Sequence, residues 1–274
     1  MNNQRGSPMR PLTTGKIYAS DDHFLLVNPP FNIQKHRHQF LHLFISLSDA
    51  PLSFHIAQQE VTGLGIMLQS NTEHAIDLNA SPPCAFLLVD HTSRLGLTLK
   101  AHSLKASENP YAVLPTKTAD ALRLLFCSIL ETAVDAESYH SQWQQLYHIM
   151  GIASGKNSHR VPDRRISKAL DILNAEGVFH LTSAQVADRV YLSPSRFSHL
   201  FKQHTGSTLK SYLLFKQLLS ALSAITQGQS VTVAAVNAGF DSPSHLSNSC
   251  KRLTGLQPSL LHKVSGFLQV SRYH

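Results

Sequence analysis

The sequence predicts an α+β protein with two domains, a β-rich domain followed by a helical one, and three observations support this fold class. At 274 residues, the chain exceeds the usual size of a single domain. Short apolar runs of strand length fill the first hundred residues, whereas apolar residues recur at helical spacing after Pro115. The net charge of +7 comes entirely from the last two fifths of the chain.

The N-terminal part, from Lys16 to about Thr98, consists of short apolar runs separated by residues that break secondary structure. Asn28-Pro29-Pro30 and Ser81-Pro82-Pro83 are two of these breakers. Strand-length runs at such regular spacing are typical of an antiparallel barrel or sandwich. The runs occupy residues 24–27, 41–45, 65–68 and 85–89.

Two amphipathic helices are predicted after the strands, at residues 118–134 and 139–150, because apolar side chains recur there every three or four positions. Two interpretations remain open for them: packing against the strands, or a dimer interface. The polar segment that follows lacks this periodicity and is expected to be a linker. The predicted organisation is therefore a domain at residues 1–152, a linker at 153–162 and a second domain at 163–274.

The charge of the chain divides at nearly the same place. Residues 1–159 hold 11 Lys and Arg against 12 Asp and Glu, whereas residues 160–274 hold 13 against 5, a net charge of +8. A basic domain of this kind suits a polyanion, because Lys and Arg that neutralise phosphates release condensed counterions. The alternative is a basic surface that is merely solvated.

Several features argue against other classes of protein. The three cysteines, Cys84, Cys127 and Cys250, form no CxxC pair and are expected to be buried free thiols rather than a disulfide framework or a zinc site. The sequence has no signal-peptide pattern and no apolar run of membrane-spanning length, so a cytoplasmic protein without membrane contact is expected. It also has no glycine-rich phosphate loop, GxSxG or HExxH motif, and we expect neither an enzyme nor a cofactor.

The C-terminal domain begins with a pattern typical of a helix-turn-helix. Thr182-Ser183-Ala184-Gln185 is a capping box that predicts a short helix to about Arg189. After a turn, Ser193-Pro194 predicts the N-cap and first position of a second helix, which ends near Thr205-Gly206. We call residues 183–205 the first unit. The face of the second helix opposite its apolar side is polar and cationic, as a helix in a major groove requires, and supplies candidate DNA-binding residues: Ser195, Arg196, Ser198, His199, Lys202 and Gln203.

The same construction recurs about 49 positions later. A short helix is predicted from Ser230 to Asn237, followed by a turn at Ala238-Gly239-Phe240 and a second helix that starts at Ser242-Pro243 and ends before Thr254-Gly255. We call residues 230–253 the second unit. Two units in register are a stronger signal than one, because any helical hairpin with a glycine turn imitates a single unit. The corresponding candidate DNA-binding residues are Pro243, Ser244, Ser247, Asn248 and Lys251.

An apolar segment at residues 209–227 connects the two units and is expected to be their shared core helix. Its 19 or so residues would make a rod of roughly 28 Å. Successive major grooves on one face of DNA lie about 34 Å apart. Units packed at the two ends of this rod are therefore expected to enter successive grooves.

Specific residues at matching places characterise both units and the connector. They are Ala187, Leu192-Ser193-Pro194, Leu200-Phe201-Lys202, Gly206, Tyr212, Ala221, Ala235, Gly239-Phe240, Lys251, Thr254-Gly255 and Pro258. With these residues, the segment from about Arg165 to Leu261 resembles the DNA-binding domain of the AraC/XylS transcription regulators. The resemblance implies an all-α domain of about seven helices, preceded by a cupin-like β-barrel that serves as an effector or dimerisation domain.

The sequence departs from the family pattern at five positions. Gln217, His199 and Asn248 stand where the family usually carries arginine, and Leu246 and Cys250 stand where it usually carries an aromatic residue. Fewer fixed charges predict weaker phosphate anchoring. The first unit is therefore expected to dominate DNA binding.

Histidines in the N-terminal domain raise the question of a metal. Cupin barrels can bind a divalent metal through an HxH pair and a distant histidine, which makes His36, His38 and His74 candidates. The glutamate expected shortly after HxH is replaced near His42, and the family pattern before His74 is altered. A degenerate barrel with solvated or hydrogen-bonded histidines is the preferred interpretation, and no metal is expected.

These features lead to one functional hypothesis, a sequence-specific transcription regulator that binds double-stranded promoter DNA and is tuned by its N-terminal domain. Its expected partners are a small-molecule effector in the barrel, a second copy of the chain, and RNA polymerase if the protein is an activator. The alternative is a ligand- or metal-sensing cupin protein. A cupin enzyme is less favoured because it leaves the basic tandem units unexplained.

Overall fold

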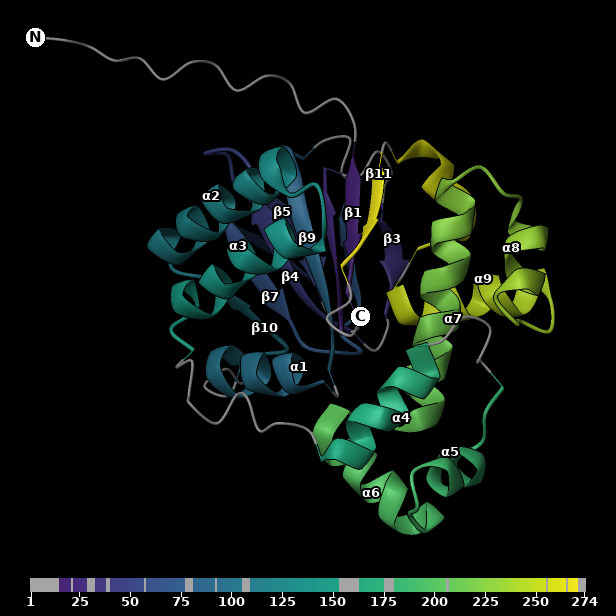
Figure 1. The fold of residues 1–274 in the computed structure, drawn as a ribbon. Helices are drawn as coiled ribbons and strands as arrows, with labels where there is room; N and C mark the ends of the chain where they lie inside the picture. Colours follow the sequence, from purple (N-terminus) through teal and green to yellow (C-terminus); the bar gives the residue numbers. More distant parts are fainter. Residues whose placement is uncertain are drawn as a thin grey trace, which may run out of the picture.

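The computed structural model describes residues 15–20, 22–28, 33–37, 40–56, 58–76, 81–91, 93–104, 109–152, 163–174, 180–205, 207–254, 256–264 and 266–270. These residues form a β-rich N-terminal domain with helices on one side, and a helical C-terminal domain (Figure 1). The α+β class predicted from the sequence is therefore confirmed.

Most strands of the N-terminal domain belong to a seven-stranded sheet in the order β10-β7-β4-β9-β2-β1-β11. The four predicted apolar runs all lie in this sheet, and each is fully or almost fully buried. The bounds are β1 Lys16–Ala19, β2 His23–Val27, β4 Phe40–Ser46, β7 Gly65–Leu68, β9 Cys84–Asp90, β10 Tyr111–Val113 and β11 Gly266–Gln269.

The remaining four strands form a second sheet in the order β3-β8-β5-β6, which packs against the inner face of the first. Phe44 of the first sheet lies between Phe86, on the same sheet, and Phe54 of the second, with ring centroids 5.0 and 4.5 Å apart. Among the described residues no ladder of hydrogen bonds joins the two sheets, so the strands form a sandwich and the predicted barrel is not closed. The bounds are β3 Ile33–His36, β5 Leu52–Ile56, β6 Gln59–Gly63 and β8 His74–Ile76.

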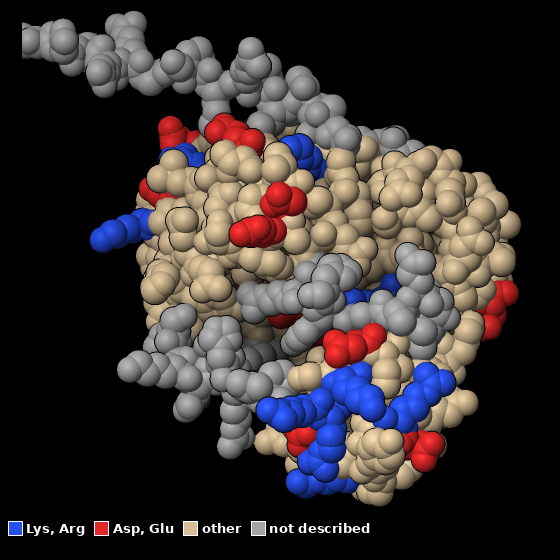
Figure 2. Space-filling view, in the orientation of Figure 1, with Lys and Arg blue, Asp and Glu red and all other residues tan. Residues whose placement is uncertain are grey.

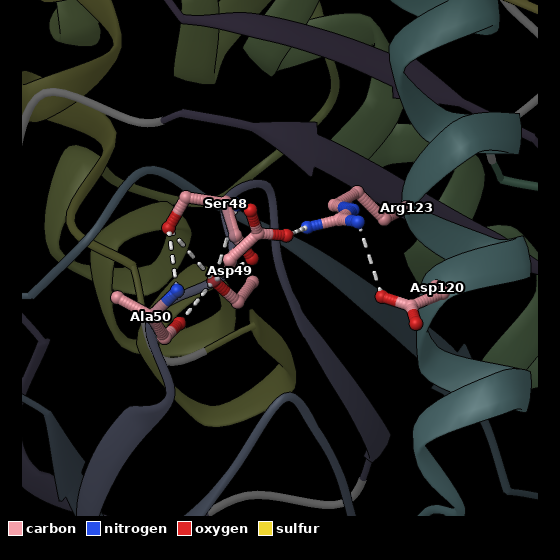
Figure 3. Close-up of polar contacts among 6 residues, drawn as sticks. Ser48, Asp49, Ala50, Asp120 and Arg123 are labelled. Carbon is pink, nitrogen blue, oxygen red and sulfur yellow. Dashed lines mark hydrogen bonds and ion pairs between the residues drawn. The ribbon is translucent and has the colours of Figure 1, made fainter.

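Helices α2 (Thr116–Thr132) and α3 (Ala136–Ile149) cover the outer face of the seven-stranded sheet (Figure 1). Their apolar faces are buried against that sheet in one continuous core, as one of the two open interpretations predicts. Arg123 of α2 fixes the helix to the turn after β4, since its guanidinium bonds Asp49 and lies 3.1 Å from Asp120 (Figure 3). The dimer interpretation remains a prediction.

One helical segment was not predicted. Residues expected to belong to strands up to Thr98 instead form α1 (Arg94–Leu99), which continues into a π-helical turn, η1 (Lys100–Leu104). The Ser93 side chain caps α1 by accepting a hydrogen bond from the Gly96 backbone at 3.0 Å. A helix of six residues is too short for periodicity to reveal it.

The C-terminal domain contains seven helical elements among the described residues, which agrees with the expected number. The first three pack with the start of α7 around a core of their own, while the rest of α7 packs with α8, α9 and η2 (Figure 1). The bounds are α4 Arg164–Asn174, α5 Ser183–Arg189, α6 Pro194–Thr205, α7 Leu209–Thr226, α8 Val231–Asn237, α9 Pro243–Thr254 and the 3₁₀-helix η2 Pro258–Lys263.

The end of the chain returns to the N-terminal domain, which the sequence did not predict. Strand β11 pairs in parallel with β1, with Gly266 opposite Lys16 and Gln269 opposite Ala19. The backbone N–H of Val270 then donates to Ala19 at 2.7 Å, and the Val270 side chain is fully buried. The last strand of the N-terminal sheet is thus supplied from beyond the helix-turn-helix units.

Two of the three cysteines are buried free thiols, as the sequence predicts. Cys84 and Cys250 are buried free thiols, but Cys127 is only half-buried on α2. Burial raises the pKa of the Cys84 and Cys250 thiols to about 12, which keeps both groups protonated at neutral pH. No helix in the described part of the chain is long and apolar enough to cross a membrane.

Candidate nucleic-acid interface

The first unit has the local geometry that its sequence predicts. The Thr182 backbone N–H donates to the Gln185 side chain at 2.9 Å, and the Gln185 N–H donates to the Thr182 hydroxyl at 3.3 Å, which completes the capping box of α5. Ser193 caps α6 by accepting from the Arg196 N–H at 3.3 Å. Proline at the first position of α6 fits because that position needs no intrahelical N–H donor.

Burial orients α6 within the first unit. Phe197 and Phe201 are fully buried, and the Phe201 ring meets Tyr212 of α7 edge-on at 5.5 Å. The predicted DNA-binding side chains therefore point away from this core. All six of them are exposed: Ser195, Arg196, Ser198, His199, Lys202 and Gln203.

The second unit repeats the same construction at the level of individual hydrogen bonds. Ser242 caps α9 by accepting from the His245 N–H at 3.0 Å, as Ser193 caps α6. In each turn a backbone N–H returns to the preceding helix at 2.9 Å, from Phe240 to Ala235 here and from Leu192 to Ala187 in the first unit. The duplication inferred from the sequence is therefore structural.

The outer face of α9 carries the candidates of the second unit. Ser244, Asn248 and Lys251 are exposed, whereas Pro243 and Ser247 are half-buried. Leu246 and Cys250, where the family usually has aromatic residues, are fully buried and contribute to the core instead of the outer face. These two departures therefore change packing and not the charge of the outer face.

Gln217, which stands where the family usually carries arginine, has a structural role that the sequence does not predict. Its side-chain amide donates to the backbone carbonyl of Gly239, in the turn of the second unit, at 2.9 Å. Gly239 has a φ of +78°, in the left-handed region that favours glycine, and the His180 ring lies beside it. Gln217 thus fixes α7 to the turn between α8 and α9.

Exposed basic side chains gather on the lobe formed by α4, α5 and α6, whereas acidic and basic side chains are mixed over the N-terminal domain (Figure 2). One of the arginines in this lobe, Arg165, pairs with Asp163 at 2.6 Å and holds the pKa of that carboxyl well below its usual range. The exposed basic residues of the lobe are Arg164, Arg165, Lys168, Arg189, Arg196 and Lys202.

A hollow of about 340 Å³ lies beside α9 and had not been predicted. It is lined by Ser247, Asn248 and Lys251 of α9 and by Gln257 and Ser259 at the start of η2. At the repeat offset of 49, Gln257 corresponds to Thr208 and Ser259 to Lys210, which follow α6 of the first unit.

The metal candidates do not form a described site. His38 lies outside the described residues, as does the side chain of His36, whose backbone pairs with His74 between β3 and β8. His74 is buried, its Nδ1 lies 2.8 Å from the Thr72 carbonyl and its ring meets His42 at 4.5 Å. The described residues include no group of three His, Cys, Asp or Glu side chains placed to hold a metal.

Comparison with known proteins locates similarity in the C-terminal domain. Residues 186–263 match a family model described as a helix-turn-helix domain. The arabinose operon regulatory protein of Escherichia coli strain K12 is 32% identical over 111 residues, which cover 39% of this chain and 37% of that protein. The corresponding protein of Salmonella typhimurium is 37% identical over 81 residues, 29% of each chain. The chain thus matches well under half the length of these relatives.

Among solved structures, one similar chain is a transcriptional regulator of Chromobacterium violaceum with an AraC-type DNA-binding domain. It is 23% identical, with a TM-score of 0.34, and the match covers 36% of this chain and 88% of that one. The residues that match the family model include most of the first unit and all of the second. The predicted resemblance of the C-terminal domain to AraC-type regulators is therefore confirmed for the helix-turn-helix region.

Proposed function

We propose that the protein is a sequence-specific transcription regulator whose helices from α4 to η2, residues 164–263, bind promoter DNA. The observation that carries this proposal is the pair of matching helix-turn-helix units, each with an exposed polar or cationic outer face, packed along one helix. Helix α7 has 18 residues and is therefore about 27 Å long, close to the roughly 34 Å between successive major grooves. The proposal places the protein in the cytoplasm with its DNA.

The N-terminal domain is proposed to be a cupin-like sensing or dimerisation domain that tunes DNA binding. Its physical connection to the DNA-binding domain supports this role. Phe215 of α7 packs between Phe24 and Phe40 on the inner face of the sheet, with ring centroids 5.1 and 6.0 Å away. An effector or a second copy of the chain that alters the sheet would shift the equilibrium between arrangements of the two units. As an activator, the protein would then contact RNA polymerase.

Binding of purified protein to a duplex selected from a randomised pool tests this function. The double variant Arg196→Ala/Lys202→Ala removes two exposed cationic side chains from α6 and is expected to weaken binding at least tenfold, because each contact to a base or phosphate contributes about 1–3 kcal/mol. Lys100→Ala/Lys117→Ala, which removes two exposed lysines from the N-terminal domain, is the matched control. Specific binding that survives the first double variant unchanged would contradict the proposal.

A further inference from the structure

We propose that the hollow between α9 and η2 is a binding site for one backbone phosphate of duplex DNA, held by Lys251 together with Gln257 and Ser259. This inference rests on the proposed DNA-binding function and adds residues outside the helix-turn-helix to it. It also gives the second unit an anchoring role besides any reading of bases.

The chemistry of the lining suits an oxyanion. Lys251 supplies an ammonium group, while the Gln257 amide and the Ser259 hydroxyl are neutral hydrogen-bond donors. Asn248 and Ser247 add two further polar side chains, Val231 and Pro258 complete the lining, and none of these described residues is acidic. A phosphodiester carries negative charge on oxygens that only accept hydrogen bonds, so this set of donors is complementary to it.

The position of the hollow on α9 also points to the DNA backbone. Ser244, Asn248 and Lys251 are spaced as i, i+4 and i+7 and therefore form one stripe along the helix, which runs into the hollow. Helix α9 has 12 residues and is about 18 Å long, whereas the major groove is about 12 Å wide. A helix that enters the groove by its N-terminal end must bring its C-terminal end to the phosphates at the edge.

The turn after α9 holds the two parts of the lining together. The Thr254 hydroxyl donates to the Cys250 carbonyl at 2.8 Å and accepts from the Leu256 N–H at 3.2 Å. Leu261 of η2 is fully buried, which fixes η2 against the core of the second unit. The site is therefore preorganised by residues that do not themselves line it.

The internal duplication supports the inference independently. At an offset of 49, Lys251, Gln257 and Ser259 correspond to Lys202, Thr208 and Lys210 of the first unit. All three of these residues are exposed at the junction of α6 and α7. Both units thus place a lysine near the end of the recognition helix with a second donor after the turn, and the first unit has two lysines where the second has one.

A variant pair on one helix tests the inference. Lys251→Ala removes the cation of the hollow, whereas Arg252→Ala removes an exposed cation from the next position, which does not line it. Full-length proteins are titrated with a selected duplex at several salt concentrations. We expect Lys251→Ala to reduce the slope of log K against log salt by about one, with unchanged sequence preference, and Arg252→Ala to leave the slope at its wild-type value.

A duplex series in which single phosphates are replaced by neutral methylphosphonates locates the contact. Replacement of one particular phosphate should weaken binding of the wild-type protein and have no further effect on Lys251→Ala. Gln257→Glu should weaken binding to the unmodified duplex, because the new carboxylate repels that same phosphate.

Additive effects of the phosphate replacement and Lys251→Ala, or equal effects of Lys251→Ala and Arg252→Ala, would overturn the inference. A wild-type protein without salt-dependent DNA binding would instead overturn the proposed function. Unchanged thermal midpoints of the variants confirm that they are folded.

Discussion

The ring of Phe215, on the helix that joins the two helix-turn-helix units, meets the ring of Phe24, on strand β2, edge-on at 5.1 Å. This contact belongs to a core that contains the inner faces of both sheets and the interior of the second unit. The first unit has a separate core. The N-terminal sheets therefore contact the second unit directly, whereas α7 links them to the first unit.

Thermal unfolding tests this coupling, because the only tryptophan, Trp143, is fully buried in the N-terminal domain. DNA at 100 times its Kd stabilises the DNA-binding domain against unfolding by about 2.7 kcal/mol. The N-terminal domain shares this stabilisation if the two domains unfold together. We expect DNA to raise the midpoint reported by Trp143 fluorescence, although the tryptophan lies outside the DNA-binding domain.

Deletion of residues 266–274 removes β11 from the edge of β1 and should reduce this DNA-induced shift, whereas deletion of 271–274 retains the strand and serves as the control. A wild-type Trp143 midpoint that does not respond to DNA would show that the two domains unfold independently.

Substitutions at two equivalent turn positions, Tyr191 and Gly239, are expected to change stability in opposite directions. Tyr191 has a φ of +56° and is 86% exposed, while Gly239, 48 positions later, has a φ of +78°. The left-handed conformation costs a non-glycine residue about 1–2 kcal/mol. Tyr191→Gly is therefore expected to stabilise the protein by about 1 kcal/mol, reduced by loss of the contact between the tyrosine ring and Lys168.

Gly239→Ala should destabilise the protein by more than 1 kcal/mol, because the added methyl group meets backbone strain and would also lie 3.1 Å from the Gln217 amide. The urea midpoints of unfolding, measured by circular dichroism, show whether each substitution stabilises or destabilises the protein. If the two substitutions shift the midpoint in the same direction, the turns are not equivalent.

The two buried thiols are expected to make the free energy of unfolding depend on pH in the alkaline range. Burial raises the pKa of Cys250 from 9.0 to about 12, so the folded state retains its proton where the unfolded state has lost it. This contribution is fully present below pH 9 and is lost as the pH rises from about 9 towards 12. The same holds for Cys84.

Cys250→Ala should therefore flatten the decrease in urea midpoint between pH 8.5 and 10.5, whatever its effect at neutral pH. A thiol reagent at pH 8 offers an independent check. It should modify the half-buried Cys127 before the other two cysteines, and rapid modification of Cys250 in the folded protein would contradict its burial.

The sequence predicted the helix-turn-helix units almost to the residue, because capping boxes, Ser-Pro starts and the duplication are local signals. The predicted helix from Ser183 to about Arg189 has those bounds, and the helix that starts at Pro194 ends at Thr205. The strands were likewise found wherever an apolar run marks a strand buried on both faces.

Features that depend on distant parts of the chain were missed. Strand β11 has only four residues and no alternation to identify it, and its partner β1 lies some 250 positions earlier. The hydrogen bond from Gln217 to the Gly239 carbonyl could not be predicted, because its acceptor is a backbone atom that only the folded chain brings near. Whether two facing sheets close into a barrel is also decided by long-range register, which no local pattern encodes.

Hydroxyl-radical footprinting of the full-length protein on a selected duplex tests the central claim most directly. If both units enter successive grooves, protection should appear as two segments about 10 base pairs apart on one face of the DNA. Lys251→Ala should weaken one of them and Arg196→Ala/Lys202→Ala should remove the other. Protection of a single short segment, or protection without any sequence preference, would contradict the account of two units that bind one site together.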